Sequence, residues 1–150
     1  DRSAYDAPHL KALLTYPNVT KIFHYARFDV AALKHHLGVA TAPVYCTKIA
    51  SKLTRTYTDR HGLKDLIKEL LGIDLNKQHQ SSDWGAHVLS DAQKQYAAQD
   101  VIYLHEVKAR LDQMLAREGR TGLASACFDF VPVRADLDLA GWTEEDVFAH

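Results

Sequence analysis

The sequence has 150 residues, 47% of them hydrophobic and 25% charged, and its formal net charge at pH 7 is −1. A chain of this length is expected to form one domain, and the near-neutral charge argues against a protein that binds long nucleic acid. The sequence has no apolar run of membrane-spanning length and no signal-peptide pattern. Its two cysteines, Cys46 and Cys127, form no C-x2-C motif. This argues against a zinc knuckle and against a disulfide framework, so we expect a protein of the reducing cytoplasm.

The charge is unevenly distributed along the chain. Residues 47–68 hold six basic and two acidic side chains, whereas residues 126–150 hold six acidic side chains against Arg134 alone. A local basic patch suits a short phosphorylated ligand better than a duplex. Two solvated faces of opposite sign, or patches that pair between subunits, are open alternatives.

The first third of the chain alternates helical and extended patterns. A short helix begins near Pro8 and ends before Pro17. Residues 19–24 are β-branched and aromatic after a turn signal, which predicts a strand. A helical pattern then begins at Arg27, and Gly38 is placed to cap its carboxyl end.

The middle of the chain continues this alternation. Residues 44–46 are a short strand candidate, followed directly by a helix over residues 47–55. Another helix runs from residue 61 or 62 to 71, and a polar, amide-rich loop covers residues 73–83. Strands alternating with longer helices indicate an α/β layer with parallel pairing.

The last 60 residues are predicted to be mainly helical. A long apolar stripe predicts a helix over residues 90–117, and a short helix is expected over residues 121–128. An extended acidic tail containing Pro132 should follow. Because this tail is rich in aromatic residues, we expect residues 121–150 to pack on the domain or at a subunit interface.

Two places in the sequence put carboxylates where they could bind a cation. Tyr96 and Asp100 are four residues apart on the long helix, so the phenol and the carboxylate share one face. Asp29 lies at the start of a helix that follows a strand, the position where open α/β sheets bind ligands. Divalent magnesium or manganese prefers such oxygen ligands. Taken singly, each could also be an ordinary surface or helix-start residue.

Asp29 belongs to one short sequence motif, Tyr96 and Asp100 belong to another, and a third motif lies between them in the sequence. Residues 23–29 (FHYARFD), residues 77–84 (KQHQSSDW) and residues 96–101 (YAAQDV) resemble motifs of the ribonuclease D branch of the DnaQ-like 3′–5′ exonucleases. Residues 45–64 and 127–150 resemble the compact nanoRNase C type of the alphaproteobacteria. The resemblance covers essentially the whole chain and implies a ribonuclease H-like α/β fold.

The resemblance assigns roles to individual residues. Asp29 and Asp100 would hold the metal ions, Tyr96 would orient the attacking water, and a tyrosine at this position defines the DEDDy subgroup. Lys77, Gln80, Trp84 and His24 fall where the family lines its nucleotide channel, although Trp84 could equally be a buried anchor. Two Mg2+ or Mn2+ ions are the implied cofactors, and a homo-oligomer, as a ring-shaped octamer, is the implied assembly.

One part of the family pattern is not found. The first motif, Asp-x-Glu on the first strand, has no counterpart in the right place; residues 136–138 have the spacing but no preceding apolar strand. We therefore expect a single exonuclease domain over residues 1–150 that lacks the first three strands and does not bind both metals properly.

Three functions remain open at this point. The leading one is a metal-dependent 3′–5′ exoribonuclease that degrades very short RNA, above all dinucleotides, to mononucleotides, inactive as this fragment. The alternatives are a ribonuclease D-like enzyme acting on longer 3′ ends, and a non-catalytic remnant that assembles with other chains or binds nucleotides.

Overall fold

Two short parallel strands lie at the centre of the molecule. The structure, a computed structural model, describes residues 8–75 and 91–150, with side chains from residue 102 onward in the second range. β1 (Lys21–Phe23) pairs with β2 (Val44–Cys46) in parallel, with Ile22 opposite Tyr45. α2 (Ala26–Leu37) makes the crossover between them. The predicted parallel pairing is therefore confirmed, although β1 is shorter than the expected strand over residues 19–24.

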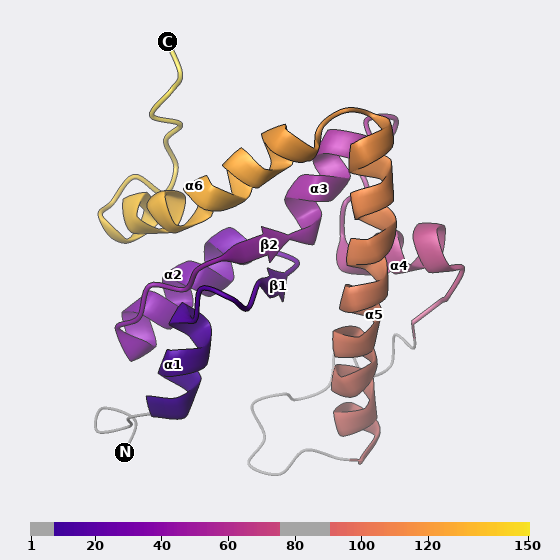
Figure 1. Cartoon of the computed structure of the whole chain (residues 1–150), viewed down its shortest axis with the longest axis horizontal. Helices are drawn as coiled ribbons and strands as arrows, with labels where there is room; N and C mark the ends of the chain where they lie inside the picture. Colours follow the sequence, from indigo (N-terminus) through magenta and orange to yellow (C-terminus); the bar gives the residue numbers. More distant parts are fainter. Residues whose placement is uncertain (1–7, 76–90) are drawn as a thin grey trace.

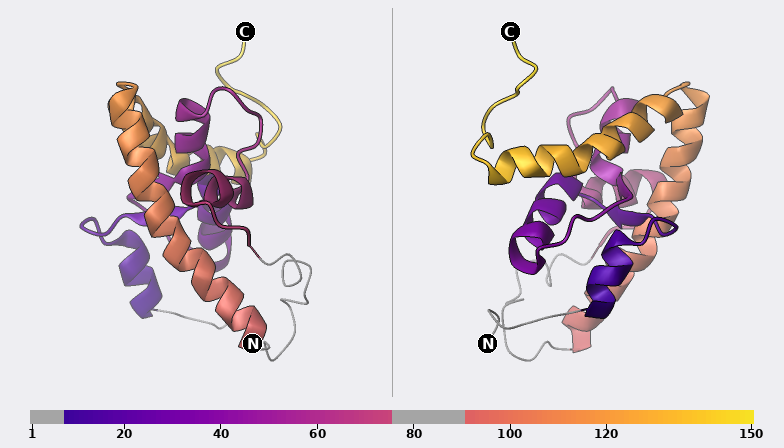
Figure 2. Two further views of the ribbon diagram at one scale, coloured as in Figure 1. Left: turned by 90° about the vertical axis from the view of Figure 1, so that its right-hand side faces the viewer. Right: turned by 60° about the vertical axis from the view of Figure 1, so that its left-hand side comes forward.

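The other helices surround this sheet: α1 (Pro8–Thr15), α3 (Thr47–Thr54), α4 (Leu63–Leu71), α5 (Asp91–Arg117) and α6 (Thr121–Leu139). α5 packs against α3, α4 and β1, while α6 packs against α2 and β2. The two long helices meet at an angle that encloses the sheet, α2 and α3 (Figure 1; Figure 2).

Glycine ends two of these helices. Gly38 and Gly72 both have a φ of 71°, and their N–H groups donate to the carbonyl oxygens of Lys34 and Lys68. Residues with a Cβ rarely adopt this left-handed conformation. The predicted cap at Gly38 is confirmed, and the chain after each glycine is free to turn toward the next element.

The core is formed where α5 and α6 meet the sheet. Val107 and Leu111 of α5 are fully buried and Leu115 is 2% exposed, as the predicted apolar stripe requires. The rings of Tyr45 on β2 and Phe128 on α6 lie 4.5 Å apart between centroids. These contacts join the sheet to both long helices.

The prediction for the last 30 residues was wrong about α6. The helix does not stop at residue 128 but continues to Leu139 with Pro132 inside it. Four residues spaced by four, three and four positions are buried on one side of it: Ala124, Phe128, Val131 and Ala135. Proline removes one helical hydrogen bond, but burial of this apolar face against α2 and β2 outweighs that cost.

The residues after α6 are exposed but attached to the domain. Arg134 donates to the carbonyl oxygens of Trp142 (3.1 Å) and Glu145 (2.9 Å). The ring centroids of Phe130 and Phe148 are 5.6 Å apart. Among the helices that the structure describes, none is both long and apolar enough to cross a membrane.

Candidate functional site

Asp29 lies in the first turn of α2, directly beyond the carboxyl end of β1. Its N–H donates to the carbonyl oxygen of Tyr25 at 3.1 Å, which fixes the start of the helix. The side chain is half-buried, and no hydrogen bond or ion pair joins its carboxylate to any described residue. Burial raises the pKa of Asp29 above its ordinary value. A carboxylate in this situation gains stability from a bound cation.

His24 links the carboxyl ends of the two strands. Its Nδ1 lies 2.9 Å from Thr47 Oγ1, and Thr47 itself donates to the carbonyl oxygen of Phe23 at 3.3 Å. The thiol of Cys46 donates to the carbonyl oxygen of His24, also at 3.3 Å. Burial, and then the charge of Lys48, lowers the pKa of His24 to about 4. His24 is therefore a neutral ring held in one orientation at pH 7.

The sequence did not predict that three residues near His24 belong to this site: Thr47, Lys48 and His61. Lys48 Nζ lies 4.5 Å from the centre of the Tyr25 ring, and its charge lowers the pKa of His24, whereas a hydrogen bond to the backbone of His61 raises it. A local signal did exist for two of them. Thr47 and Lys48 directly follow the strand at residues 44–46, just as His24 follows β1, and parallel strands end at one edge of the sheet.

The other predicted catalytic residues lie on α5. Tyr96 and Asp100 are within this helix, one turn apart, as predicted. Their side chains lie outside the part of the chain whose side chains are described, as do the candidate substrate residues Lys77, Gln80 and Trp84. The convergence of Asp100 on Asp29 therefore stays a prediction.

Asp136 and Asp138, which have the spacing of the first family motif, are engaged elsewhere. Arg27 donates to both carboxylate oxygens of Asp138 at 2.7 Å. Lys34 forms an ion pair with Asp136. Arg27 holds the pKa of Asp138 below its ordinary value, chiefly through the hydrogen bonds. These two aspartates attach α6 to α2 and are not metal ligands here.

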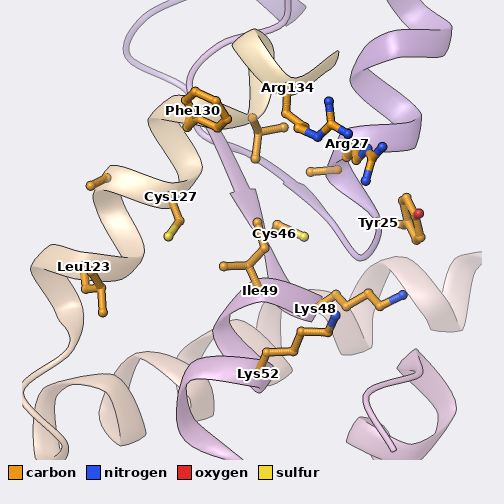
Figure 3. A pocket seen from close by; sticks show the side chains of 13 residues that line it. Tyr25, Arg27, Cys46, Lys48, Ile49, Lys52, Leu123, Cys127, Phe130 and Arg134 are labelled. Atoms are coloured by element: carbon orange, nitrogen blue, oxygen red, sulfur yellow. The ribbon is translucent and has the colours of Figure 1, made fainter. Parts of the chain in front are cut away.

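A cavity of about 510 Å³ lies between α3 and α6, next to Tyr25 (Figure 3). Its walls are mainly apolar, with Ile49 from α3 and Leu123 and Phe130 from α6. The figure shows basic groups at two ends: Arg27 and Arg134 at one, and Lys48 and Lys52 at the other. Arg27 and Arg134 both form ion pairs with the single carboxylate of Asp138, whereas Lys52 has no acidic partner among the described side chains.

The described residues provide one candidate metal ligand at the sheet edge. Within residues 8–75 and 102–150, no group of three or more His, Cys, Asp or Glu side chains lies together as a metal-binding cluster. Asp29 nevertheless fits the role, since it is half-buried, faces no described cation and follows a strand. A divalent ion bound by oxygen ligands suits it.

Comparison with known sequences supports the same chemistry. Residues 2–116 match the family described as 3′–5′ exonuclease. Ribonuclease D of Acidiphilium cryptum is 39% identical over 115 residues, 77% of this chain and 29% of that protein. DNA polymerase I of Aquifex aeolicus is 42% identical over 92 residues, 61% of this chain and 16% of that protein. The chain thus spans about 29% of the length of the first ribonuclease D relatives.

Comparison with solved structures extends the match to nearly the whole chain. Brucella melitensis NrnC is 59% identical with a TM-score of 0.91, covering 99% of this chain and 73% of that one. Escherichia coli RNase D is 27% identical with a TM-score of 0.77, covering 87% and 35%. The predicted α/β exonuclease fold is therefore confirmed. The chain belongs to the 3′–5′ exonuclease family, in its ribonuclease D branch, and is similar to Brucella NrnC over nearly its whole length, which includes α5 and the part of α2 that contains Asp29.

Proposed function

We propose that this protein is a metal-dependent 3′–5′ exoribonuclease that degrades very short RNA, above all dinucleotides, to mononucleotides. The observation that carries the proposal is the half-buried carboxylate of Asp29, which has no partner among the described residues at the carboxyl end of β1. The substrate class is supported by a similar structure, Brucella melitensis NrnC bound to pGG, which is 58% identical to this chain with a TM-score of 0.91. Another structure of that protein has bound Mg2+.

The proposed mechanism gives this chain's residues separate tasks. Asp29 and Asp100 hold the divalent ions, Mg2+ or Mn2+, and Tyr96 orients the attacking water. Lys77, Gln80, Trp84 and His24 line the nucleotide channel. The ions, when bound, supply positive charge at the oxygens that attack and leave the phosphorus. A neutral His24 adds a fixed hydrogen-bonding ring without a second charge.

The decisive experiment compares two RNA lengths. In the presence of Mg2+, we expect the protein to hydrolyse 5′-phosphorylated diguanosine (pGG) faster than a longer single strand, and we expect Asp100→Asn to lose the activity. Asp129→Asn is the matched control, because Asp129 is exposed on α6. Faster turnover of the longer strand would favour ribonuclease D-like processing. Binding of pGG with no hydrolysis would favour a non-catalytic module.

The proposal includes assembly into a homo-oligomer, as an octameric ring, in the cytoplasm. Large apolar side chains are exposed on α6 and after it: Leu123 is 57% exposed and Phe148 66%. Exposed apolar patches of this kind often mark interfaces. Because α6 contributes to the core, removing it would unfold the domain. Sedimentation of Leu123→Ser or Phe148→Ser, each expected to dissociate the assembly, is the suitable test. The two free cysteines, Cys46 and Cys127, agree with a reducing compartment.

A further inference from the structure

The cavity between α3 and α6 has one end at which positive charge is not neutralised. Lys48 and Lys52 line this lysine end, one helical turn apart on α3 (Figure 3). No described acidic side chain forms an ion pair with either lysine. Lys48 lies over the Tyr25 ring instead, with its Nζ 4.5 Å from the ring centre. An occupant that brings negative charge to the lysine end is therefore favoured.

The rest of the cavity is mainly apolar, and the candidate metal ligand does not line it. Ile49 of α3 and Leu123 and Phe130 of α6 are among its walls, and Leu123 is 57% exposed. Asp29 is not among the lining residues. A ligand that fits this cavity has a large apolar group next to a cluster of negative charges.

The chain itself has a segment of this chemistry after α6. Residues 143–148 (TEEDVF), here called the acidic arm, contain three acidic side chains followed by two apolar ones, and no basic residue. All of them are exposed, and Phe148 is 66% exposed. Figure 1 and Figure 2 show that the chain after α6 projects away from the other helices. The acidic arm is therefore exposed for contact with a second molecule.

Within one copy, the described contacts of the acidic arm lie at the opposite end of the cavity. Arg134 donates to the carbonyl oxygen of Glu145 at 2.9 Å. The ring of Phe148 lies 5.6 Å from the ring of Phe130, which is next to Arg134 in Figure 3. No described ion pair involves the carboxylate of Glu145 or Asp146. The arm thus leaves the lysine end of its own copy without an anion, and a second copy supplies the same segment.

We propose that the cavity binds the acidic arm of a second copy of this chain. The Phe148 ring of that copy enters the apolar part of the cavity. Its Glu145 and Asp146 carboxylates pair with the lysine end. In a two-fold arrangement each copy gives its arm and receives the other, so that every contact is made twice. The inference rests on the homo-oligomer in the proposed function and identifies a contact that forms it.

The first test measures assembly by sedimentation velocity. Lys52→Glu and the double variant Glu145→Lys/Asp146→Lys each bring like charges together, so each should raise the dissociation constant of the copies about tenfold or more. Combining all three substitutions should restore assembly, because opposite charges meet again. Arg110→Glu is the matched control and should assemble like the wild type, since Arg110 is an exposed residue of α5 that does not line the cavity.

The outcomes separate this inference from the proposed function. If the wild type assembles and either charge-reversed protein assembles equally well, or if the triple variant does not recover, this inference is overturned and the homo-oligomer stands. If the wild type is monomeric, the proposed assembly fails together with this inference, and hydrolysis of pGG still decides the proposed activity. Weaker binding of pGG by Lys52→Glu with unchanged assembly overturns this inference and assigns the lysine end to RNA.

The second test uses carbodiimide cross-linking, which joins a lysine amine to a carboxylate in contact with it, to identify the copy that provides the arm. Unlabelled and 15N-labelled wild-type proteins are mixed, allowed to exchange subunits, cross-linked and digested for mass spectrometry. We expect peptides that join Lys48 or Lys52 to Glu145 or Asp146, with the two halves carrying different labels. If these peptides are absent, or if both halves always carry the same label, the arm of a second copy does not bind the cavity and the proposal is overturned.

Discussion

Replacement of Tyr45 by phenylalanine tests how the sheet is attached to the helix that carries Tyr96 and Asp100. Tyr45 lies on β2 and is 5% exposed, and its hydroxyl donates to Asp112 Oδ1 of α5 at 2.8 Å. Burial, and then this hydrogen bond, raises the pKa of Tyr45. The hydroxyl is therefore a donor at every physiological pH, and it links the two elements of the candidate site.

The size of the effect follows from the surroundings of the bond. A hydrogen bond to a charged group contributes about 1.5–3 kcal/mol. The side chain of Asp112 is 42% exposed and retains Lys108 at 2.8 Å, so the lower end of that range applies. The phenyl ring stays in contact with Phe128 and leaves no cavity. We expect Tyr45→Phe to lose about 1.5 kcal/mol, which lowers Tm by roughly 3–6 °C for a domain of this size.

Urea unfolding followed by circular dichroism measures the difference, with an unchanged slope expected because no additional surface is exposed. Tyr57→Phe is the matched control. Tyr57 also donates to a carboxylate, Glu69 Oε2 at 2.6 Å, but is 67% exposed. Water can replace that bond, so its loss should cost less than about 1 kcal/mol. If Tyr57→Phe destabilises the protein as much as Tyr45→Phe, the argument from burial is wrong.

Three further predictions concern the metal, the pH and α6. Asp29→Asn should leave the Tm of the metal-free protein unchanged or higher, since burial disfavours the charged carboxylate. It should abolish the stabilisation by Mg2+, which is about 2.7 kcal/mol for the wild type when the Mg2+ concentration is 100 times Kd. Equal increases of Tm with Mg2+ in the two proteins, measured in a thermal scan, would exclude Asp29 as a ligand. The free energy of unfolding should fall as the pH is lowered from 6.5 toward 4, because unfolded His24 takes up a proton near 6.5 whereas folded His24 resists protonation until about 4. Unfolding curves of His24→Asn should therefore depend less on pH in that window, and an identical dependence would contradict the assignment. Pro132→Ala should stabilise the protein by roughly 2 kcal/mol: proline inside a helix costs about 3 kcal/mol, and part of that gain is lost because the unfolded chain has more conformational entropy without the proline. A loss of stability in urea would show that the proline ring is needed for packing.

The sequence predicted those parts of the fold that depend on neighbouring residues. The glycine at position 38 ends α2 because only the local backbone conformation matters there. The stripe that includes Val107 and Leu111 placed the buried face of α5 correctly, because helical spacing alone defines a face. The prediction for α6 failed because Pro132 is a local signal against a helix, whereas the packing of Phe128 and Val131 on distant elements decided the outcome.

The candidate site also has features that local sequence predicts and contacts that only the tertiary structure reveals. The sequence by itself placed Asp29 after a strand, and Tyr96 and Asp100 one turn apart on a helix, because each pattern lies within a few residues. Only the tertiary structure brought Thr47 to His24 across 23 positions and Arg55 to Glu69 across 14. Sequence spacing carries no information about such contacts, because they form where buried polar groups from separate elements must satisfy one another's hydrogen bonds.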